Sequence, residues 1–255
     1  MATQFPSEII DLPSKGYFYP EDNALSNGTI EIKCMTAKEE DILTSKNLIQ
    51  KGIVIDVLLK SLIVSPVKYE DLLIGDKNAI LVASRILAYG KDYEVQISCP
   101  SCDTKSQFYV DLTTFESKEI DLSLFTKGSK TFSFILPFSK RNLELKLASH
   151  SDELAIESEI KAMKKISSQT GVDSEITTRL RNIIVSVDGN YEKKYINNFV
   201  DTELLSRDSL ELRKFLRQST PDIDMISNFE CPSCGQSKNV QIPLTVDFFW
   251  PSGRE

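Results

Sequence analysis

The sequence lacks the features of a membrane or secreted protein. Its apolar stretches are short: residues 53–55, for example, are followed at once by a charged residue. The first residues carry neither a basic segment nor an apolar core, so no signal peptide is predicted. We therefore expect the protein to be made in a reducing cytoplasm and to have no membrane partner.

Histidine and positive charge are also scarce. The one histidine, His150, lies at the start of an expected helix, which favours a surface position over a role as catalytic base. The 255 residues include 30 Lys+Arg and 37 Asp+Glu, a net charge of -7. A protein that binds nucleic-acid phosphates usually has a basic surplus, so this partner is disfavoured. With 41% hydrophobic and 26% charged residues, the chain has the composition of a folded globular protein.

Four of the five cysteines form two close pairs. Cys99 and Cys102 lie in one Cys-Pro-Ser-Cys sequence, and Cys231 and Cys234 lie in another. Each sequence stands between two expected strands, and two such turns can place four thiolates around one tetrahedral zinc ion. No coordination position stays open for water or substrate. We therefore predict a closed, structural zinc site.

Other uses of the four cysteines fit the pattern less well. Disulfides are disfavoured in a reducing compartment, and a thioredoxin-like pair needs one motif at a strand-to-helix junction rather than two in hairpins. An iron–sulfur cluster is compatible with four cysteines, although its usual bunched spacing is missing. Gly235, and Asp103 at the matching place, suit a left-handed residue after each pair. Cys34 stands alone on an expected strand and is predicted to be a buried structural thiol.

The hydrophobic pattern predicts an α+β protein with a helical body, a small β layer and a four-cysteine zinc ribbon assembled from two sequence-distant hairpins. We expect helices at 36–48, 54–63, 77–89, 149–168, 174–184 and 201–218, a strand at 29–34, and hairpins at 93–112, 130–147 and 227–246. Thr36 and Ser149 begin capping boxes, and Asp188 with Gly189 marks a turn.

These elements divide the chain into four parts. They are an extended N-terminal arm (1–28), an α/β part (29–91), the zinc ribbon (92–112 plus 226–248) and a mainly helical insertion with a hairpin (113–225).

Aromatic residues cluster near both ends of the chain. Tyr17, Phe18 and Tyr19 lie in a stretch whose prolines and glycine forbid a helix, and residues 247–253 form a second aromatic segment. Large rings at a terminus either cover the chain's own core or dock on a neighbouring subunit. The sequence leaves both alternatives open.

No catalytic constellation emerges from the remaining residues. Residues 128–131 (GSKT) have some likeness to a phosphate-binding loop, but the first glycine of that motif is absent and Ser129 replaces the second. The carboxylates of 152–159 fit a helix start and a solvated face. In residues 91–112 and 226–248, which contain the two cysteine hairpins, three lysines stand against six carboxylates, so the ribbon does not favour nucleic acid either. We predict that the protein is not an enzyme.

The order of these segments is similar to that of the baseplate hub subunit family of T-even-like contractile-tailed bacteriophages. Residues 10–20 (IDLPSKGYFYP) resemble the opening of its cyanophage-type members. The resemblance covers nearly the whole chain. Its cysteine motifs are widespread in zinc ribbons, whereas the order of segments and the N-terminal stretch are more specific.

The resemblance implies a non-enzymatic structural or assembly component of the hub or wedge region of a phage tail baseplate. Such a protein resides in the virion and binds other baseplate and tail proteins within a larger assembly. Only the four paired cysteines carry over from the family, as metal ligands. Two other functions compete with this one: a zinc-ribbon adaptor of the nucleic-acid machinery, and a thiol oxidoreductase.

Overall fold

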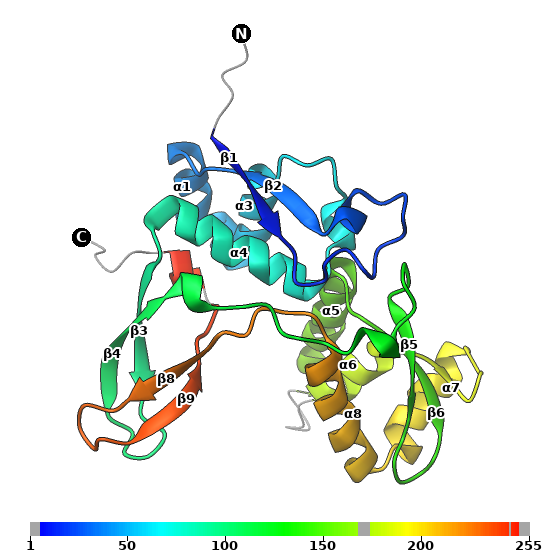
Figure 1. Cartoon of the computed structure of the whole chain (residues 1–255). Helices are drawn as coiled ribbons and strands as arrows, with labels where there is room; N and C mark the ends of the chain where they lie inside the picture. The colour runs from blue at the N-terminus through cyan, green and yellow to red at the C-terminus, as the bar shows by residue number, and fades with distance from the viewer. Residues whose placement is uncertain (1–5, 168–173, 245, 250–255) are drawn as a thin grey trace.

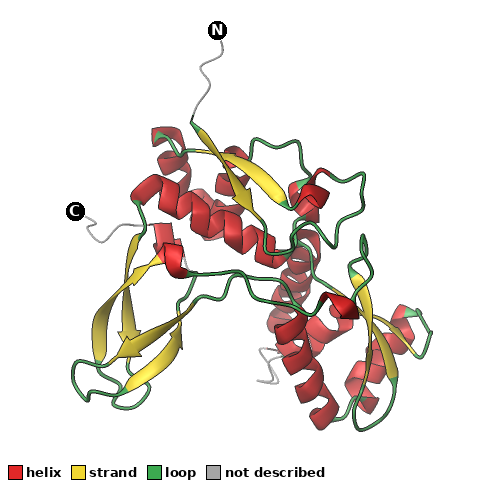
Figure 2. Cartoon of the chain, viewed as in Figure 1, coloured by secondary structure: helices red, strands yellow, loops and turns green. Residues whose placement is uncertain are grey.

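The computed structural model describes residues 6–167, 174–244 and 246–249 (Figure 1, Figure 2). The helices are α1 (Ala37–Thr44), α2 (Lys46–Lys51), α3 (Val54–Leu62), α4 (Ile74–Tyr89), α5 (His150–Ser167), α6 (Glu175–Ile183), α7 (Lys193–Asn198) and α8 (Ser206–Ser219). The strands are β1 (Ser7–Asp11), β2 (Thr29–Lys33), β3 (Asp92–Ser98), β4 (Lys105–Asp111), β5 (Thr131–Ile135), β6 (Asn142–Lys146), β7 (Ile184–Val187), β8 (Ile226–Glu230) and β9 (Ser237–Gln241). The α+β prediction is confirmed. Within these ranges, no helix has the length and apolar character that crossing a membrane requires.

The elements form three groups in space (Figure 1). An upper group contains β1, β2 and α1–α4, a lower group contains α5–α8 with the sheet β5–β6–β7, and the hairpins β3–β4 and β8–β9 lie together at one side. The two connections that join the hairpins to the lower group run side by side. The amide of Lys118 donates to the carbonyl of Asp222 at 2.8 Å, and that of Asp224 donates to Glu116 at 2.9 Å. The chain therefore leaves the first hairpin and returns to the second along two paired segments, residues 116–118 and 222–224, which we call the doubled linker.

All the sheets are small and antiparallel. The hairpin expected at 130–147 is β5–β6, and β7 adds a third strand beside β6. Asp188 and Gly189 form the turn after β7 with φ of 50° and 79°, as expected. A two-stranded sheet is marginal in water. Each hairpin here therefore relies on packing against other elements.

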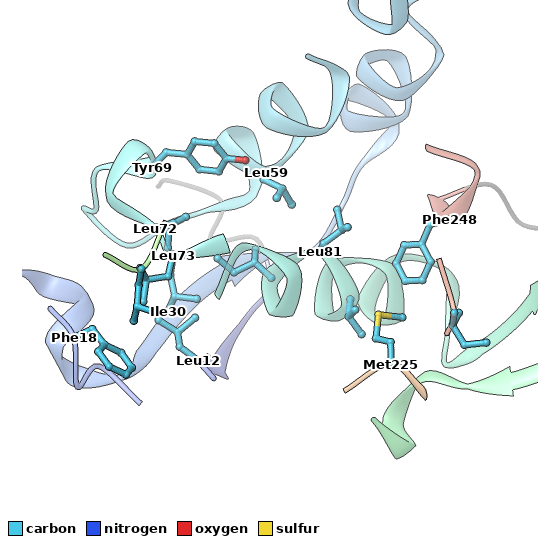
Figure 3. Packing of buried hydrophobic residues seen from close by; sticks show 14 of the residues in the cluster. Leu12, Phe18, Ile30, Leu59, Tyr69, Leu72, Leu73, Leu81, Met225 and Phe248 are labelled. Atoms are coloured by element: carbon cyan, nitrogen blue, oxygen red, sulfur yellow. The ribbon is translucent and has the colours of Figure 1, made fainter. Parts of the chain in front are cut away.

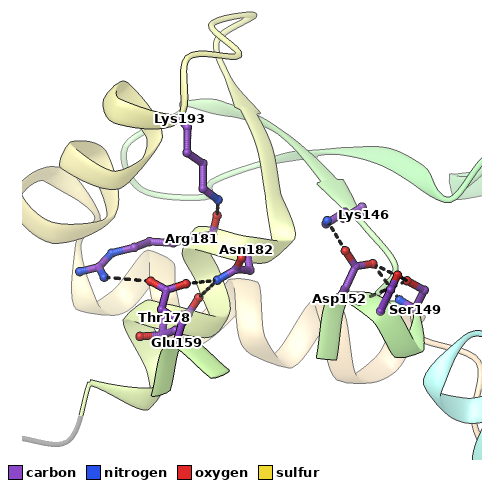
Figure 4. A network of polar contacts seen from close by, with 9 residues as sticks. Lys146, Ser149, Asp152, Glu159, Thr178, Arg181, Asn182 and Lys193 are labelled. Carbon is purple, nitrogen blue, oxygen red and sulfur yellow. Dashed lines mark hydrogen bonds and ion pairs between the residues drawn. The ribbon is translucent and has the colours of Figure 1, made fainter. Parts of the chain in front are cut away.

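Both predicted capping boxes are present. The Glu39 side chain accepts from the Thr36 amide at 2.9 Å and from Lys33 at 2.8 Å. Burial alone would raise the pKa of Glu39, but the bonds from Lys33 and Thr36 outweigh it and lower the pKa to about 2. At the start of α5, Asp152 accepts from the Ser149 amide at 2.9 Å (Figure 4). These bonds satisfy helix amides that would otherwise lack a partner.

The helix boundaries differ from expectation in three places. The helix expected at 36–48 is two helices, because Ser45 is extended (φ -67°, ψ 105°) and separates α1 from α2. Helix α4 begins three residues earlier than expected, at Ile74. The helix expected from residue 201 begins at Ser206, because Phe199–Glu203 form a wide π turn that buries Phe199 after α7.

The aromatic cluster near the N-terminus packs inside the chain. Phe18 and Tyr19 are 0% and 1% exposed. The Tyr19 hydroxyl donates to Asp76 on α4 at 2.6 Å and accepts from the Leu73 amide at 2.9 Å. Asp76 also accepts from the Ser14 amide at 2.9 Å. Burial raises the pKa of Asp76, and these donors are what make its burial tolerable.

One hydrophobic core runs along α4 (Figure 3). Phe18 and Tyr69 belong to one end of it, Leu81 lies near the middle, and Met225 and Phe248 pack at the other end. The aromatic segment near the C-terminus is therefore a core element as far as Phe249; residues 250–253 lie outside the described ranges. Of the two alternatives for the aromatic ends, the structure supports packing on the chain's own core.

Polar contacts hold the lower group together. Asn182 on α6 donates to Glu159 on α5 at 2.8 Å, and Lys193 donates to the carbonyl of Arg181 (Figure 4). On the other side of the group, Asp208 of α8 is fully buried and accepts from the amides of Phe138 and Ser139 at 2.8 and 3.0 Å. These bonds fix α8 to the turn between β5 and β6.

Two expectations about single residues need correction. His150 is 2% exposed, so its predicted surface position is wrong. Its ring packs against Tyr69, its Nδ1 lies 3.3 Å from Lys77 Nζ, and its Nε2 lies 3.6 Å from Asp56. The first turn of α5 faces α4 and the segment around Tyr69, which the local pattern could not show. Cys34 is half-buried rather than buried, because it follows β2 at the edge of the core.

Gly75 marks the contact between α4 and the doubled linker. A Cβ at this position would lie 1.9 Å from the carbonyl oxygen of Pro221. We expect Gly75→Ala to destabilise the fold by about 1–3 kcal/mol, although alanine is ordinarily the better helix residue. Ser84→Ala on the same helix is the control, because the buried Ser84 hydroxyl has no partner among the described residues and its loss should be nearly neutral. Urea unfolding measures both, and equal stability of the two variants would contradict the close approach.

The buried His150 predicts a loss of stability in mild acid. Burial, and then the charge of Lys77, lower the pKa of His150 below its ordinary value. The nearby charge of Asp56 acts in the opposite direction but does not outweigh them. As the pH falls, the unfolded chain therefore takes up this proton before the folded chain does. The contribution of neutral His150 to the free energy of unfolding is fully present above about pH 6.5, and below that pH it decreases by at most about 1.4 kcal/mol per pH unit. His150→Gln can keep both polar contacts without titrating. Between pH 6.5 and 5, its unfolding free energy should vary less than that of the parent; identical slopes would refute the assignment.

Candidate metal centre

The two Cys-Pro-Ser-Cys sequences form equivalent turns. In the first hairpin, the last paired residues are Ser98 and Lys105, and in the second they are Glu230 and Ser237. Inside the first turn, the Cys99 amide donates to the Thr104 carbonyl at 2.9 Å. Inside the second, the Cys231 amide donates to the Gln236 carbonyl at 3.0 Å. Two segments about 130 residues apart thus adopt the same local structure.

A left-handed residue follows the second cysteine of each turn. Asp103 has φ 57° and Gly235 has φ 67°, and each donates its amide to the carbonyl of the first cysteine of its turn at 2.9 Å. Both predicted left-handed positions are confirmed. Aspartate tolerates this conformation better than most residues with a side chain, and glycine adopts it freely.

The turns bring the four thiols to one point. The Sγ atoms of Cys99, Cys102, Cys231 and Cys234 all lie within 4.8 Å of one another. Across the two hairpins, Cys99 Sγ lies 3.8 Å from Cys234 Sγ, and Cys102 Sγ lies 3.7 Å from Cys231 Sγ. A tetrahedron with metal–sulfur bonds of about 2.3 Å has its sulfurs about 3.8 Å apart. The spacing therefore fits one tetrahedrally bound ion.

The turns also create an environment for thiolates. The Ser101 amide lies 3.4 Å from Cys99 Sγ, and this bond lowers the pKa of Cys99. The hydroxyl and amide of Thr104 lower the pKa of Cys102 to about 6. The amide of Gln236 favours the Cys234 thiolate as well, but desolvation and the neighbouring thiols raise its pKa to about 11. Four thiolates so close together repel one another, so a cation is needed to hold all of them deprotonated.

Side chains outside the cluster join the two hairpins. The Ser101 hydroxyl donates to the Gln236 side chain at 2.5 Å, directly between the two turns. Phe108 of β4 and Phe229 of β8 meet edge to face with ring centres 5.4 Å apart. Cys99 and Cys231, the first cysteine of each turn, are each 1% exposed, whereas the second of each turn is at the surface.

Arg85 attaches this double hairpin to the body of the protein. Its side chain is 2% exposed and donates to the carbonyls of Phe248 at 3.0 Å, Gly90 at 3.0 Å and Asp92 at 3.4 Å. The ring of Phe248 also packs on Tyr93 at 4.9 Å. Sequence reasoning missed Arg85, and a charged residue within the apolar stripe of α4 was the signal available.

The other residues considered from the sequence lie elsewhere. Within the described ranges, the four cysteines are the one group of His, Cys, Asp or Glu side chains arranged to hold a metal. Cys34 is outside the cluster, and Asp152 caps α5 and pairs with Lys146 at 2.5 Å. The cluster offers four identical soft ligands and no histidine or carboxylate, so it suits a thiolate-bound ion with a filled coordination shell.

Comparison with known proteins identifies the family. A model of the T4 bacteriophage base plate protein family matches residues 10–250, which include both cysteine hairpins and the whole segment between them. Searches of curated proteins and of solved structures gave no significant match. The family match extends over nearly the whole described structure. The chain therefore belongs to the T4 bacteriophage base plate protein family.

Proposed function

We propose that this baseplate-family protein is a non-enzymatic component of the hub or wedge region, acting through protein–protein contacts and stabilised by one structural zinc ion. Cys99, Cys102, Cys231 and Cys234 are the proposed ligands. The family supports a structural role in the tail baseplate. One observation carries the metal proposal: the sulfurs of two sequence-distant hairpins lie at the spacing of a tetrahedral thiolate site.

The geometry favours a bound metal over a disulfide or a thioredoxin-like redox pair. A disulfide requires sulfurs about 2.05 Å apart, and the contacts across the hairpins are 3.7 and 3.8 Å. A redox pair of the thioredoxin type begins a helix, whereas both pairs here lie between antiparallel strands. Zinc accepts four thiolates in a closed tetrahedron and holds together segments that do not fold alone. A structural ion is therefore preferred to a catalytic one.

The proposed location is the virion, after synthesis in the cytoplasm of the host bacterium. The proposed partners are other proteins of the baseplate and tail. A zinc-ribbon adaptor for nucleic acid is the alternative, and Tyr109, which is 67% exposed, is a surface ring that a base could stack on. Residues 91–112 and 226–248 nevertheless carry three lysines against six carboxylates, which opposes binding to phosphates.

The zinc proposal predicts the metal content and the effect of one ligand. The purified protein should contain about one zinc per chain by elemental analysis. Cys231→Ser should lose the metal and lower Tm by at least about 5 °C, corresponding to roughly 2 kcal/mol. Cys34→Ser is the matched control, because Cys34 lies outside the cluster and should change neither quantity much. A folded, thiol-intact protein without metal, or a Cys231→Ser variant as stable as the parent, would disprove the structural zinc.

The baseplate proposal predicts where the protein is found. Quantitative mass spectrometry of purified tails should detect the protein in a fixed ratio to the other baseplate proteins if it is a permanent component. An assembly factor should instead be present in baseplate intermediates and missing from finished tails. Absence from both preparations, while the protein accumulates in infected cells, would reject a role in the baseplate.

A further inference from the structure

A groove lies between α6 and α8 on the lower group, away from the cysteine cluster. It encloses about 360 Å³, and its lining includes Ile176, Leu180, Val200, Leu204, Ser209 and Arg213. This size is at the lower end of the range for sites that bury an organic group, about 300–1,000 Å³.

The groove has a buried apolar floor and an exposed apolar rim. Leu180 and Val200 are 3% and 5% exposed and form the floor. Ile176 on the rim is 49% exposed, and Leu205, which lies between two residues of the lining, is 52% exposed. Apolar surface that is hollowed and accessible in this way is typical of a place where another protein inserts a side chain.

Arg213 gives the groove its charge. It is the one charged residue in the lining, and its Nε donates to the carbonyl of Ser209 at 3.3 Å. Within the described residues, neither Arg213 nor Arg217 one turn later has a carboxylate partner. Arg141 and Arg181 of the same group each pair with two carboxylates. In a chain of net charge -7, an arginine in the lining of an apolar groove, with no carboxylate partner among the described residues, makes a local site for negative charge.

We propose that this groove docks a segment of a different protein that presents a large apolar side chain next to a carboxylate. The apolar side chain covers Leu180 and Val200, and the carboxylate pairs with Arg213, which has the fork geometry for it. Nucleic acid fits less well, because phosphates gain nothing from an apolar floor. This inference does not depend on the metal, and within a baseplate it assigns one of the partner contacts to α6 and α8.

Site-specific crosslinking tests the proposal in the full chain. The photoreactive residue p-benzoyl-phenylalanine is placed at Ile176, and the protein is produced together with the other baseplate proteins of its phage. After irradiation, mass spectrometry should find a crosslink to a different protein, in a segment with an aspartate or glutamate beside apolar residues. The same substitution at Ile9, which is 74% exposed on β1, is the control for unspecific capture.

Charge reversal tests the role of Arg213. Arg213→Glu, at an exposed position, should fold normally and reduce the yield of the Ile176 crosslink at least tenfold, about 1.4 kcal/mol. Lys51→Glu, the same charge change at an exposed position on α2, should leave the yield unchanged. Replacing the partner's carboxylate with arginine should restore the crosslink to Arg213→Glu. A crosslink to a second copy, to nucleic acid or to no protein in assemblies that contain the chain would overturn the proposal, as would a full yield from Arg213→Glu.

Discussion

The convergence of four thiols from two distant hairpins is the constraint on which the rest of the structure depends. Each hairpin has two strands, and such a pair is marginal in water without further packing. The ring contact between Phe108 and Phe229 and the bond between Ser101 and Gln236 join the hairpins, but they form a small interface. The thiol cluster is its centre. Because Cys102 and Cys231 lie 129 residues apart in sequence, the entire segment between them must begin and end at one place. The doubled linker meets this requirement, because its two segments, residues 116–118 and 222–224, are hydrogen-bonded to each other between the hairpins and the lower group.

Buried polar groups fix how elements are arranged within the upper and lower groups and how α4 joins the double hairpin. Asp76 ties the N-terminal turn to α4, Arg85 ties the end of α4 to the double hairpin, and Asp208 ties α8 to the sheet of the lower group. Burying a charged group is costly unless hydrogen bonds replace its water. In all three cases backbone amides or carbonyls supply bonds, and their directions are set by the fold. An apolar contact is non-directional and tolerates several relative positions of the elements, whereas these buried groups form their hydrogen bonds only when the elements are positioned as they are here. The same logic explains why Gly75 has no side chain where the linker carbonyl of Pro221 passes closest to α4.

Membership in the baseplate family makes the surfaces of this protein, through which a baseplate component contacts its neighbours, the features of most interest. The aromatic residues near both ends could have supplied such a surface, but most of them form the core along α4. Other apolar side chains that stay exposed are spread over several elements, including Ile9, Tyr109 and Ile135. The groove between α6 and α8 differs from these single residues because it combines a hollow with an unpaired charge.

Local patterns in the sequence determined much of the secondary structure and the choice of the four cysteines proposed as ligands. Capping boxes at Thr36 and Ser149, the turn at Asp188 and the left-handed residues Asp103 and Gly235 depend on contacts within a few residues, so they could be predicted without the fold. The spacing within each cysteine pair likewise fixes two sulfurs on one side of a turn. Tertiary structure alone decided the burial of His150, the inward packing of the N-terminal aromatics and the role of Arg85. Each of these depends on segments that are far apart in the sequence, and neither periodicity nor spacing records which of them will meet.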